Sequence, residues 1–170
     1  MAIRTILHYP DKRLRASGAT VTDFGDEFQA LVEDMAETMY AAPGVGLAAP
    51  QIGVAKRLFV IDIAGADEPS ELRVFVNPRI LDAIGEICWE EGCLSFPGVT
   101  EEIDRAERVT VKAQDRHGNA FELEAEGLLA IAIQHENDHL DGKLMVDHLG
   151  MLKRRMIDRA MRKRAAEANA

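Results

Sequence analysis

The stretch Gly127-Leu128-Leu129-Ala130-Ile131-Ala132-Ile133-Gln134-His135-Glu136-Asn137-Asp138-His139-Leu140 decides how this chain is built. Its first half is apolar on all sides, and that pattern is typical of a buried helix. Its second half contains His-Glu-x-x-His, whose two histidines emerge about 40° apart around a helix axis. The two rings can hold one metal ion, with Glu136 beside it as a general base. The sequence therefore predicts a metal-binding helix in the core of a metal-dependent hydrolase.

Several strands are predicted in the part of the chain that precedes this helix. Apolar or alternating residues predict a buried strand, then two strands separated by a turn at Asn77-Pro78, then a hairpin. These strands cover Arg57–Ile63, Leu72–Val76, Arg79–Ile84, Val109–Ala113 and Ala120–Glu124, and the hairpin turn covers Arg116–Asn119. A further strand-like stretch occupies Ile87–Glu90.

Two more helices are expected near the ends of the chain. Apolar residues at helical spacing predict one helix over Gly25–Ala41, with Asp23 as its N-cap and Pro43-Gly44 as its end. An amphipathic pattern predicts another over Leu149–Ala166. Because strands and helices do not alternate regularly, we expect an α+β fold. Antiparallel or mixed sheets would pack around the central metal-binding helix, flanked by the N-terminal and C-terminal helices.

Length and composition limit the class of protein. The chain has 170 residues, 47% of them hydrophobic, so we expect one catalytic domain over residues 1–170. Apolar runs long enough to cross a membrane are missing from the sequence, and the first residues lack the apolar stretch of a signal peptide. We therefore expect a cytoplasmic protein with no membrane partner. Two cysteines give no disulfide framework of the secreted kind.

Charge is spread unevenly along the chain. Residues 153–164 carry seven basic side chains against Asp158 alone, a net +6. The remainder carries −15, since the whole chain carries −9. An acidic body argues against general nucleic-acid binding through the main surface. The basic segment is either a solvated helix face or a docking surface.

Two histidines do not complete a catalytic metal site, which usually takes three protein ligands and keeps one position open. Cys93, in Glu91-Gly92-Cys93-Leu94-Ser95, is the better third candidate, because Gly92 allows close backbone approach and Cys93 can present a thiolate. The other histidines, His8, His117 and His148, are expected at the surface or in packing contacts.

A closed structural site with Cys88 as a fourth ligand is the alternative. The 41 residues between Cys93 and His135 exceed the spacing of a zinc finger. Cys88 and Cys93 are also an odd number of residues apart, so on one strand they would face opposite sides. We expect Cys88 to be a small buried apolar residue.

A third segment, Gly44-Val45-Gly46-Leu47-Ala48-Ala49-Pro50-Gln51, has very small side chains. Another molecule's backbone could lie against such a surface. An ordinary loop that ends a helix would also explain Gly44, but it would not require Gln51. A side-chain amide at Gln51 can donate to a developing oxyanion.

Together, Gly44–Gln51, Glu91–Ser95 and Gln134–Leu140 resemble, in order and spacing, the three signature motifs of the peptide deformylase family. The resemblance extends over nearly the whole chain, including Tyr9–Arg15, and is to the bacterial type with a helical C-terminus. It implies three metal ligands (Cys93, His135 and His139), Glu136 as the catalytic acid and base, and an oxyanion hole formed by Gln51 with the N–H of Leu94.

The resemblance also implies a reaction and a substrate. The expected activity is removal of the N-formyl group from the N-terminal formylmethionine of newly synthesised proteins, with release of formate. The methionine pocket would be lined by Val45, Leu128 and Ile131, although a plain core role remains equally open for the last two. The substrate backbone would lie along Gly46 and Gly92–Leu94 like an added strand. Many bacterial relatives carry an arginine near Thr100, which this chain lacks.

The expected cofactor is one divalent metal ion. A Cys/His/His donor set suits zinc, iron(II), nickel or cobalt. The resemblance implies iron(II) in the cell, and zinc, nickel or cobalt can occupy the site in a purified sample. The expected partner is the N-formylmethionyl nascent polypeptide, and Lys153–Arg164 could dock on the ribosome.

Two other functions compete with this interpretation. A metallo-endopeptidase also uses His-Glu-x-x-His, but it explains neither Gly44–Gln51 nor Glu91–Ser95. A non-catalytic, zinc-stabilised interaction domain would require a closed site and would give Glu136 no role.

Overall fold

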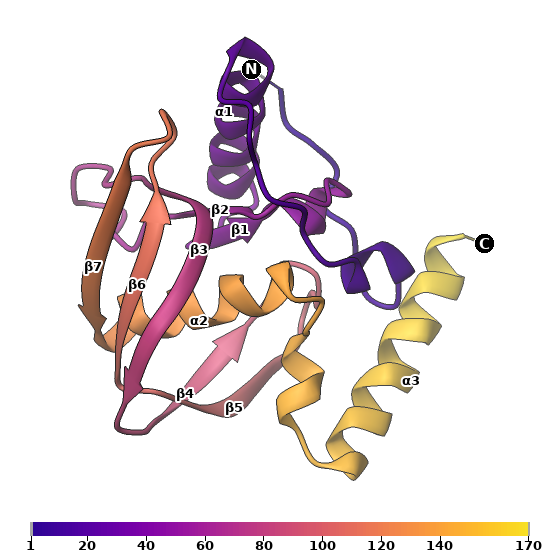
Figure 1. Ribbon diagram of the computed structural model, residues 1–170. Helices are drawn as coiled ribbons and strands as arrows, with labels where there is room; N and C mark the ends of the chain where they lie inside the picture. The colour runs from indigo at the N-terminus through magenta and orange to yellow at the C-terminus, as the bar shows by residue number, and fades with distance from the viewer. Residues whose placement is uncertain (1, 170) are drawn as a thin grey trace.

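Helix α2 (Gly127–Leu140) runs through the middle of the molecule, and the other elements pack around it (Figure 1). The computed structural model describes residues 2–169. The observed bounds of α2 match the predicted ones. Its buried residues include both histidines and Glu136 as well as the apolar Ala130–Ile133 segment. The helix therefore carries its polar functional groups inside the core.

The larger sheet has five strands in the order β1-β2-β3-β6-β7, and every neighbouring pair is antiparallel. Its strands are β1 (Gly46–Ala48), β2 (Leu58–Ile61), β3 (Arg73–Ile84), β6 (Arg108–Gln114) and β7 (Ala120–Glu126). The predicted hairpin is present as β6 and β7, and the predicted buried strand is β2. The α+β class is confirmed.

A second sheet contains only β4 (Ile87–Gly92) and β5 (Thr100–Arg105), paired antiparallel. The sequence indicated the first of these strands but not the second. On β5 the two buried side chains are Ile103 and Arg105. Because a charged residue takes an inward position, the strand lacks the alternation of apolar and polar residues that would predict it from sequence. This sheet lies beside α2 (Figure 1). Glu91 and Cys93 approach the histidines of that helix.

Strand β1 lies between two helices. Leu47 packs with the apolar face of α1 (Asp26–Ala41), in a cluster that includes Met35 and Met39. Ala48 faces the other way and packs in a cluster with Ile133 of α2. Because successive residues of a strand point to opposite faces, Gly46 is on the same side as Ala48, toward α2.

The N-terminal helix begins at Asp26, and its N-cap residue is Gly25 rather than the predicted Asp23. The carboxylate of Asp23 accepts a hydrogen bond from the Gly25 N–H at 2.9 Å. Asp23 therefore stabilises the turn before the helix and does not cap the helix itself. The prediction failed because an aspartate can bond the backbone two residues ahead in either role.

The predicted turn at Asn77-Pro78 is wrong. Strand β3 continues through it, and the register against β6 shifts between Val76 and Arg79. Asn77 has φ of 50°, and its side chain bonds both polar backbone atoms of Val21 and the Gln114 side chain. Proline and a positive φ thus mark a bulge, which bends one long strand.

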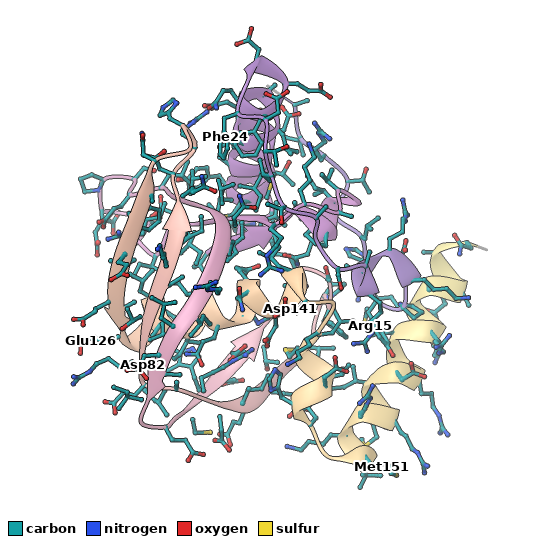
Figure 2. All side chains as sticks on the ribbon, in the orientation of Figure 1. Arg15, Phe24, Asp82, Glu126, Asp141 and Met151 are labelled. Carbon is teal, nitrogen blue, oxygen red and sulfur yellow. The ribbon has the colours of Figure 1, made fainter. Side chains whose placement is uncertain are left out.

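The C-terminal helix α3 (Met151–Ala168) is the least buried element. It packs through Ile157 and Met161, and Asp158 accepts a 2.6 Å hydrogen bond from the Tyr9 hydroxyl. Met151 projects from the start of the helix, away from the rest of the chain (Figure 2). Short 3₁₀ turns cover Lys12–Arg15, Ala49–Ile52 and Met145–His148. Among residues 2–169, helices long and apolar enough to span a bilayer are absent.

Candidate active site

Three potential metal ligands converge at the inner side of α2. The Sγ atom of Cys93 and one ring nitrogen each of His135 and His139 all lie within 4.8 Å of one another. Both histidines are buried, and Cys93 is half-buried. The histidines come from α2, and Cys93 comes from the segment that directly follows β4. The chain thus closes the group from two segments far apart in sequence.

The donor atoms fit a tetrahedral ion. Metal–sulfur and metal–nitrogen bonds of about 2.3 and 2.0–2.1 Å place two tetrahedral ligands about 3.5 Å apart. The Sγ of Cys93 and the Nε2 of His139 are 3.5 Å apart. The Nδ1 of His139 is buried with no hydrogen-bond partner among residues 2–169. Thiolate and imidazole are ligands for zinc and for the divalent ions of the later first transition row.

A buried chain of charges orients His135. Its Nδ1 lies 2.8 Å from Oε1 of Glu91, which leaves Nε2 free for a metal. Arg105 donates two hydrogen bonds to Glu91, of 2.7 and 2.9 Å, and one of 2.7 Å to Asp138. Burial opposes the charge on Glu91, but the hydrogen bonds from Arg105 and His135 outweigh it and lower its pKa to about 2. A ligand histidine with a carboxylate on its other nitrogen is held in one tautomer and one orientation.

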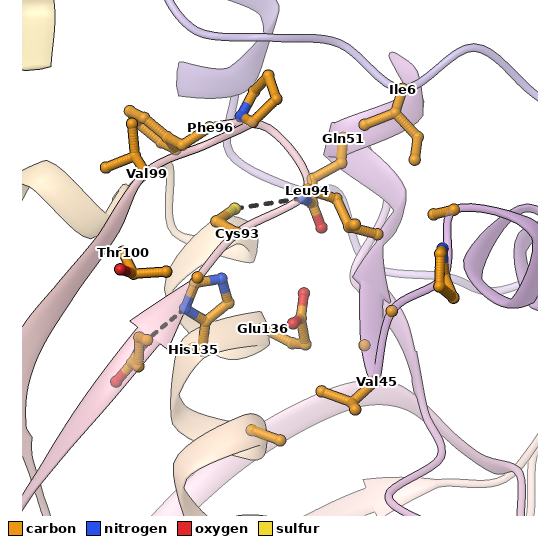
Figure 3. A pocket seen from close by; sticks show the side chains of 18 of the residues that line it. Ile6, Val45, Gln51, Cys93, Leu94, Phe96, Val99, Thr100, His135 and Glu136 are labelled. Carbon is orange, nitrogen blue, oxygen red and sulfur yellow. Dashed lines mark hydrogen bonds and ion pairs between the residues drawn. The ribbon is translucent and has the colours of Figure 1, made fainter. Parts of the chain in front are cut away.

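Glu136 lies between the ligand group and strand β1 (Figure 3). Its side chain is only 5% exposed, and its Oε1 has no hydrogen-bond partner among residues 2–169. Burial raises the pKa of Glu136 to about 7, with the charges of His135 and Glu91 acting in opposite directions. A carboxyl group with a pKa near neutrality can both accept and donate a proton at working pH.

Gln51 is fixed from both ends of its amide. The Ala48 N–H donates to its Oε1 at 2.9 Å, and its Nε2 donates to Ser95 Oγ at 3.1 Å. The same Nε2 lies 3.6 Å from the Cys93 sulfur (Figure 3). Gln51 is 1% exposed, so its N–H group is held beside the metal ligands.

A cavity of about 720 Å³ opens onto these groups. The residues predicted to bind substrate all line it, together with Leu94 and Gln51: Val45, Gly46, Gly92, Leu128 and Ile131. Val45 and Leu128 are 49% and 37% exposed, so they form its mouth rather than the core. Ile131 is buried and forms part of its wall.

Trp89 and Ala132 also line the cavity, and the sequence reasoning missed both. Trp89 is 44% exposed at the mouth. One signal could have found it: it lies two residues before Glu91 on β4, so both residues share the strand face toward α2. Ala132 gave no signal, because a small apolar residue in an apolar helix is indistinguishable from core.

Cys88 is exposed, and the prediction that it is a buried apolar residue is wrong. Cys88 lies on β4 three residues before the buried Glu91, so it faces the opposite side of the strand from that carboxylate. Sheet β4–β5 has α2 on one face only, so the other face is left to solvent. The ligand group contains Cys93 and the two histidines without Cys88, which removes the basis for a closed four-ligand site.

The other histidines lie outside the ligand group. His117 is exposed in the β6–β7 turn, and His8 is exposed at the rim of the cavity. His148 contacts Asp138 at 2.7 Å and so extends the charge chain of Arg105 toward the surface. These positions match the surface and packing roles expected for them.

Comparison with known proteins decides the family. The model of the family described as polypeptide deformylase matches residues 3–155. The chain belongs to this family. Among curated relatives, peptide deformylase 1 of Shewanella oneidensis is 50% identical over 167 residues, 98% of each chain. The peptide deformylase of Chromobacterium violaceum is 52% identical over 164 residues, 96% of this chain and 97% of the relative.

Solved deformylase structures share the fold. The crystal structure of a peptide deformylase from Legionella pneumophila superposes with a TM-score of 0.92 at 53% identity, covering 99% of both chains. The Ehrlichia chaffeensis peptide deformylase in complex with actinonin superposes with a TM-score of 0.90 at 37% identity, covering 96% of this chain and 98% of that one.

The family and activity predicted from the motifs are thereby confirmed. The chain is a deformylase, a hydrolase that removes the N-formyl group from formylmethionine at the start of new proteins. Metallo-endopeptidase and non-catalytic interaction domain are both excluded as descriptions of a chain with this family membership.

Proposed function

We propose that Glu136 moves the protons of the reaction beside a divalent ion held by Cys93, His135 and His139. The observation that carries this proposal is the buried Glu136 carboxylate, which faces the substrate cavity next to the ligand group. One of its oxygens has no hydrogen-bond partner among residues 2–169. A buried acceptor without a partner is costly unless it has a functional partner, here a water molecule or the substrate. We also propose that residues 1–170 act as one catalytic domain.

The ion, when bound, supplies Lewis acidity that makes a water molecule more acidic and polarises the formyl carbonyl. Glu136 accepts a proton from the attacking water as the oxygen bonds to the formyl carbon. Glu136 then delivers that proton to the departing amine, so that formate and a free N-terminus are produced. A pKa of about 7 lets Glu136 both accept and donate a proton near neutral pH.

We assign the oxyanion site to Gln51 and the N–H of Leu94. As the formyl carbon becomes tetrahedral, negative charge moves to its oxygen, and N–H donors fixed in place stabilise it most. The Gln51 amide is already oriented by Ala48 and Ser95. The plane of the amide is therefore fixed before the substrate binds.

The methionine side chain of the substrate fits the apolar part of the cavity. We assign Ile131 to its wall, and Val45, Leu128 and Trp89 to its mouth. The backbone of the peptide would extend along Gly92 and Gly46, where two edges of sheet meet the cavity. An unbranched, flexible thioether fills an irregular apolar pocket of this kind well.

The decisive experiment measures formate release from formyl-Met-Ala-Ser. Wild-type protein loaded with iron, nickel or cobalt should release formate, and actinonin, the ligand in the Ehrlichia chaffeensis complex, should inhibit it. Glu136→Gln should keep the metal and lose about 10²–10⁴ in kcat. Glu102→Gln, at an exposed position of β5 outside the cavity lining, serves as the matched control. A Glu136→Gln variant with normal turnover and normal metal content would refute the assigned role.

We propose iron(II) as the ion used in the cell. The Cys/His/His donor set accepts iron(II), zinc, nickel or cobalt. Its thiolate can be oxidised, so oxygen must be excluded when the bound metal is identified. Metal analysis after strictly anaerobic purification should find iron. Zinc as the dominant metal under those conditions would contradict this assignment.

We further propose a cytoplasmic location and docking of α3 on the ribosome, from which the nascent substrate emerges. The start of α3 exposes Met151, Leu152 and Met156, at 70%, 73% and 63%, among the basic residues of Lys153–Arg164. Co-sedimentation with ribosomes should weaken as salt rises and on reversal of Arg155 and Arg159 to glutamate. Salt-independent binding, or no effect of charge reversal, would refute docking.

A further inference from the structure

Gly46 has no side chain, yet its surroundings leave no room for one. A Cβ atom at this position would lie 2.6 Å from Oε2 of Glu136, and 3.0 and 3.1 Å from the Cδ and Cγ of the same side chain. Non-bonded atoms attract best at about 3.5–4.0 Å, so such a methyl group would overlap the carboxylate. The three nearest atoms all belong to Glu136.

The backbone itself does not require glycine here. Gly46 lies in β1, opposite Ile61 of β2, and is not among the residues of the described chain with positive φ. An alanine could adopt the same strand conformation. The next residue on the same strand face, Ala48, carries a Cβ and packs against α2. The steric restriction is therefore specific to the contact between Gly46 and Glu136.

Other contacts do little to hold the carboxylate of Glu136. Its Oε1 has no hydrogen-bond partner among residues 2–169, and the side chain is 5% exposed. Its neighbour His135 is tied to Glu91, so the helix cannot turn to release the side chain without breaking that bond. The position of the carboxylate depends on the space that Gly46 leaves empty.

We propose that Gly46 is a positioning residue for Glu136: its missing side chain creates the space in which the carboxylate lies beside the metal ligands. The inference rests on the proposed role of Glu136. Two roles of Gly46, positioning Glu136 and contacting the substrate backbone, have different kinetic consequences. A displaced base lowers kcat, whereas a blocked substrate raises KM.

The first experiment compares Gly46→Ala with wild type and with Gly150→Ala, on formyl-Met-Ala-Ser. No atom lies within 4 Å of a Cβ at Gly150, so that variant should match wild type. Gly46→Ala should lose at least about tenfold in kcat, with KM within about twofold and with full metal content. An unchanged kcat, or a loss confined to KM, overturns the inference. Failure of wild type to release formate would instead overturn the proposed function.

The second experiment places Gly46→Ala in a Glu136→Asp background. Aspartate is one methylene shorter and withdraws the carboxylate by about 1.5 Å, which relieves the overlap. Gly46→Ala should then cost less than about twofold in kcat, because the two positions act through one contact. Equal losses in both backgrounds overturn the inference. If Gly46→Ala alone does not fold, the double variant should fold; a double variant that also fails to fold overturns it.

Discussion

Arg105 pairs with two carboxylates inside the fold. Its side chain is 4% exposed and lies between Glu91, also 4% exposed, and Asp138. Two charges removed from water are tolerated only when their partners are in place, and loss of one partner leaves the other uncompensated. Because Glu91 also orients His135, the same arginine connects stability to the ligand group.

Arg105→Met should therefore lower the free energy of unfolding by about 3–5 kcal/mol. The matched control is Arg108→Met, whose ion pair with Glu126 is 3.6 Å long and has side chains 64% and 74% exposed. An exposed pair of this kind contributes about 0–1 kcal/mol. Urea unfolding of both variants measures the difference. Equal destabilisation of the two would contradict a special role for the buried arginine.

At the scale of elements, the bulge in β3 depends on Asn77. This residue combines φ of 50° with three side-chain hydrogen bonds of 2.7–2.9 Å, to Val21 and Gln114. Asparagine tolerates the left-handed region better than alanine does, and glycine tolerates it best. The hydrogen bonds of Asn77 and its ability to adopt a positive φ are thus two separable contributions to the stability of the bulge.

Replacement of Asn77 by glycine should remove the hydrogen bonds alone, whereas replacement by alanine should also impose backbone strain. We expect Asn77→Ala to be less stable than Asn77→Gly by about 1 kcal/mol. Both should be less stable than wild type in urea unfolding. If alanine proves as stable as glycine at this position, strain at the bulge is negligible.

The helices were more predictable than the strands. The bounds of α2 follow from its apolar run and from the motif residues, which need helical spacing to act together. The inward face of β5 could not be predicted from the sequence. Arg105 occupies a core position there because it pairs with two carboxylates that are distant in sequence. Asn77-Pro78 resembled a turn because a bulge and a turn use the same residues. The spacing of Trp89 and Glu91 on β4 indicates a shared strand face, but the packing of β4 against α2 was needed to show that this face lines the cavity.

On the scale of the whole molecule, the ligand group joins two parts of the fold. Cys93 belongs to the segment after β4, while His135 and His139 belong to α2. An ion that binds only the folded chain stabilises it by mass action. Its removal should therefore loosen the contact between the small sheet and the central helix.

Adding nickel to metal-free protein should raise the midpoint of thermal unfolding by about 5–10 °C at a hundredfold excess over Kd. Cys88→Ser should respond in the same way, because Cys88 is exposed and outside the ligand group. Cys93→Ser should respond much less, since a hydroxyl is a poor substitute for a thiolate. Differential scanning fluorimetry measures these shifts in the unfolding midpoint. Equal shifts in the two cysteine variants would argue against Cys93 as a ligand.

Trp89 is the sole tryptophan of the sequence, and it stands half in water at the mouth of the cavity. The tryptophan fluorescence of this enzyme therefore comes from one position, next to where the methionine side chain of the substrate would enter. Occupation of the cavity excludes water from the indole and should shift its emission to shorter wavelength. The intrinsic fluorescence of Trp89 should therefore report whether the cavity is occupied. It needs no added label and can be followed during a single turnover.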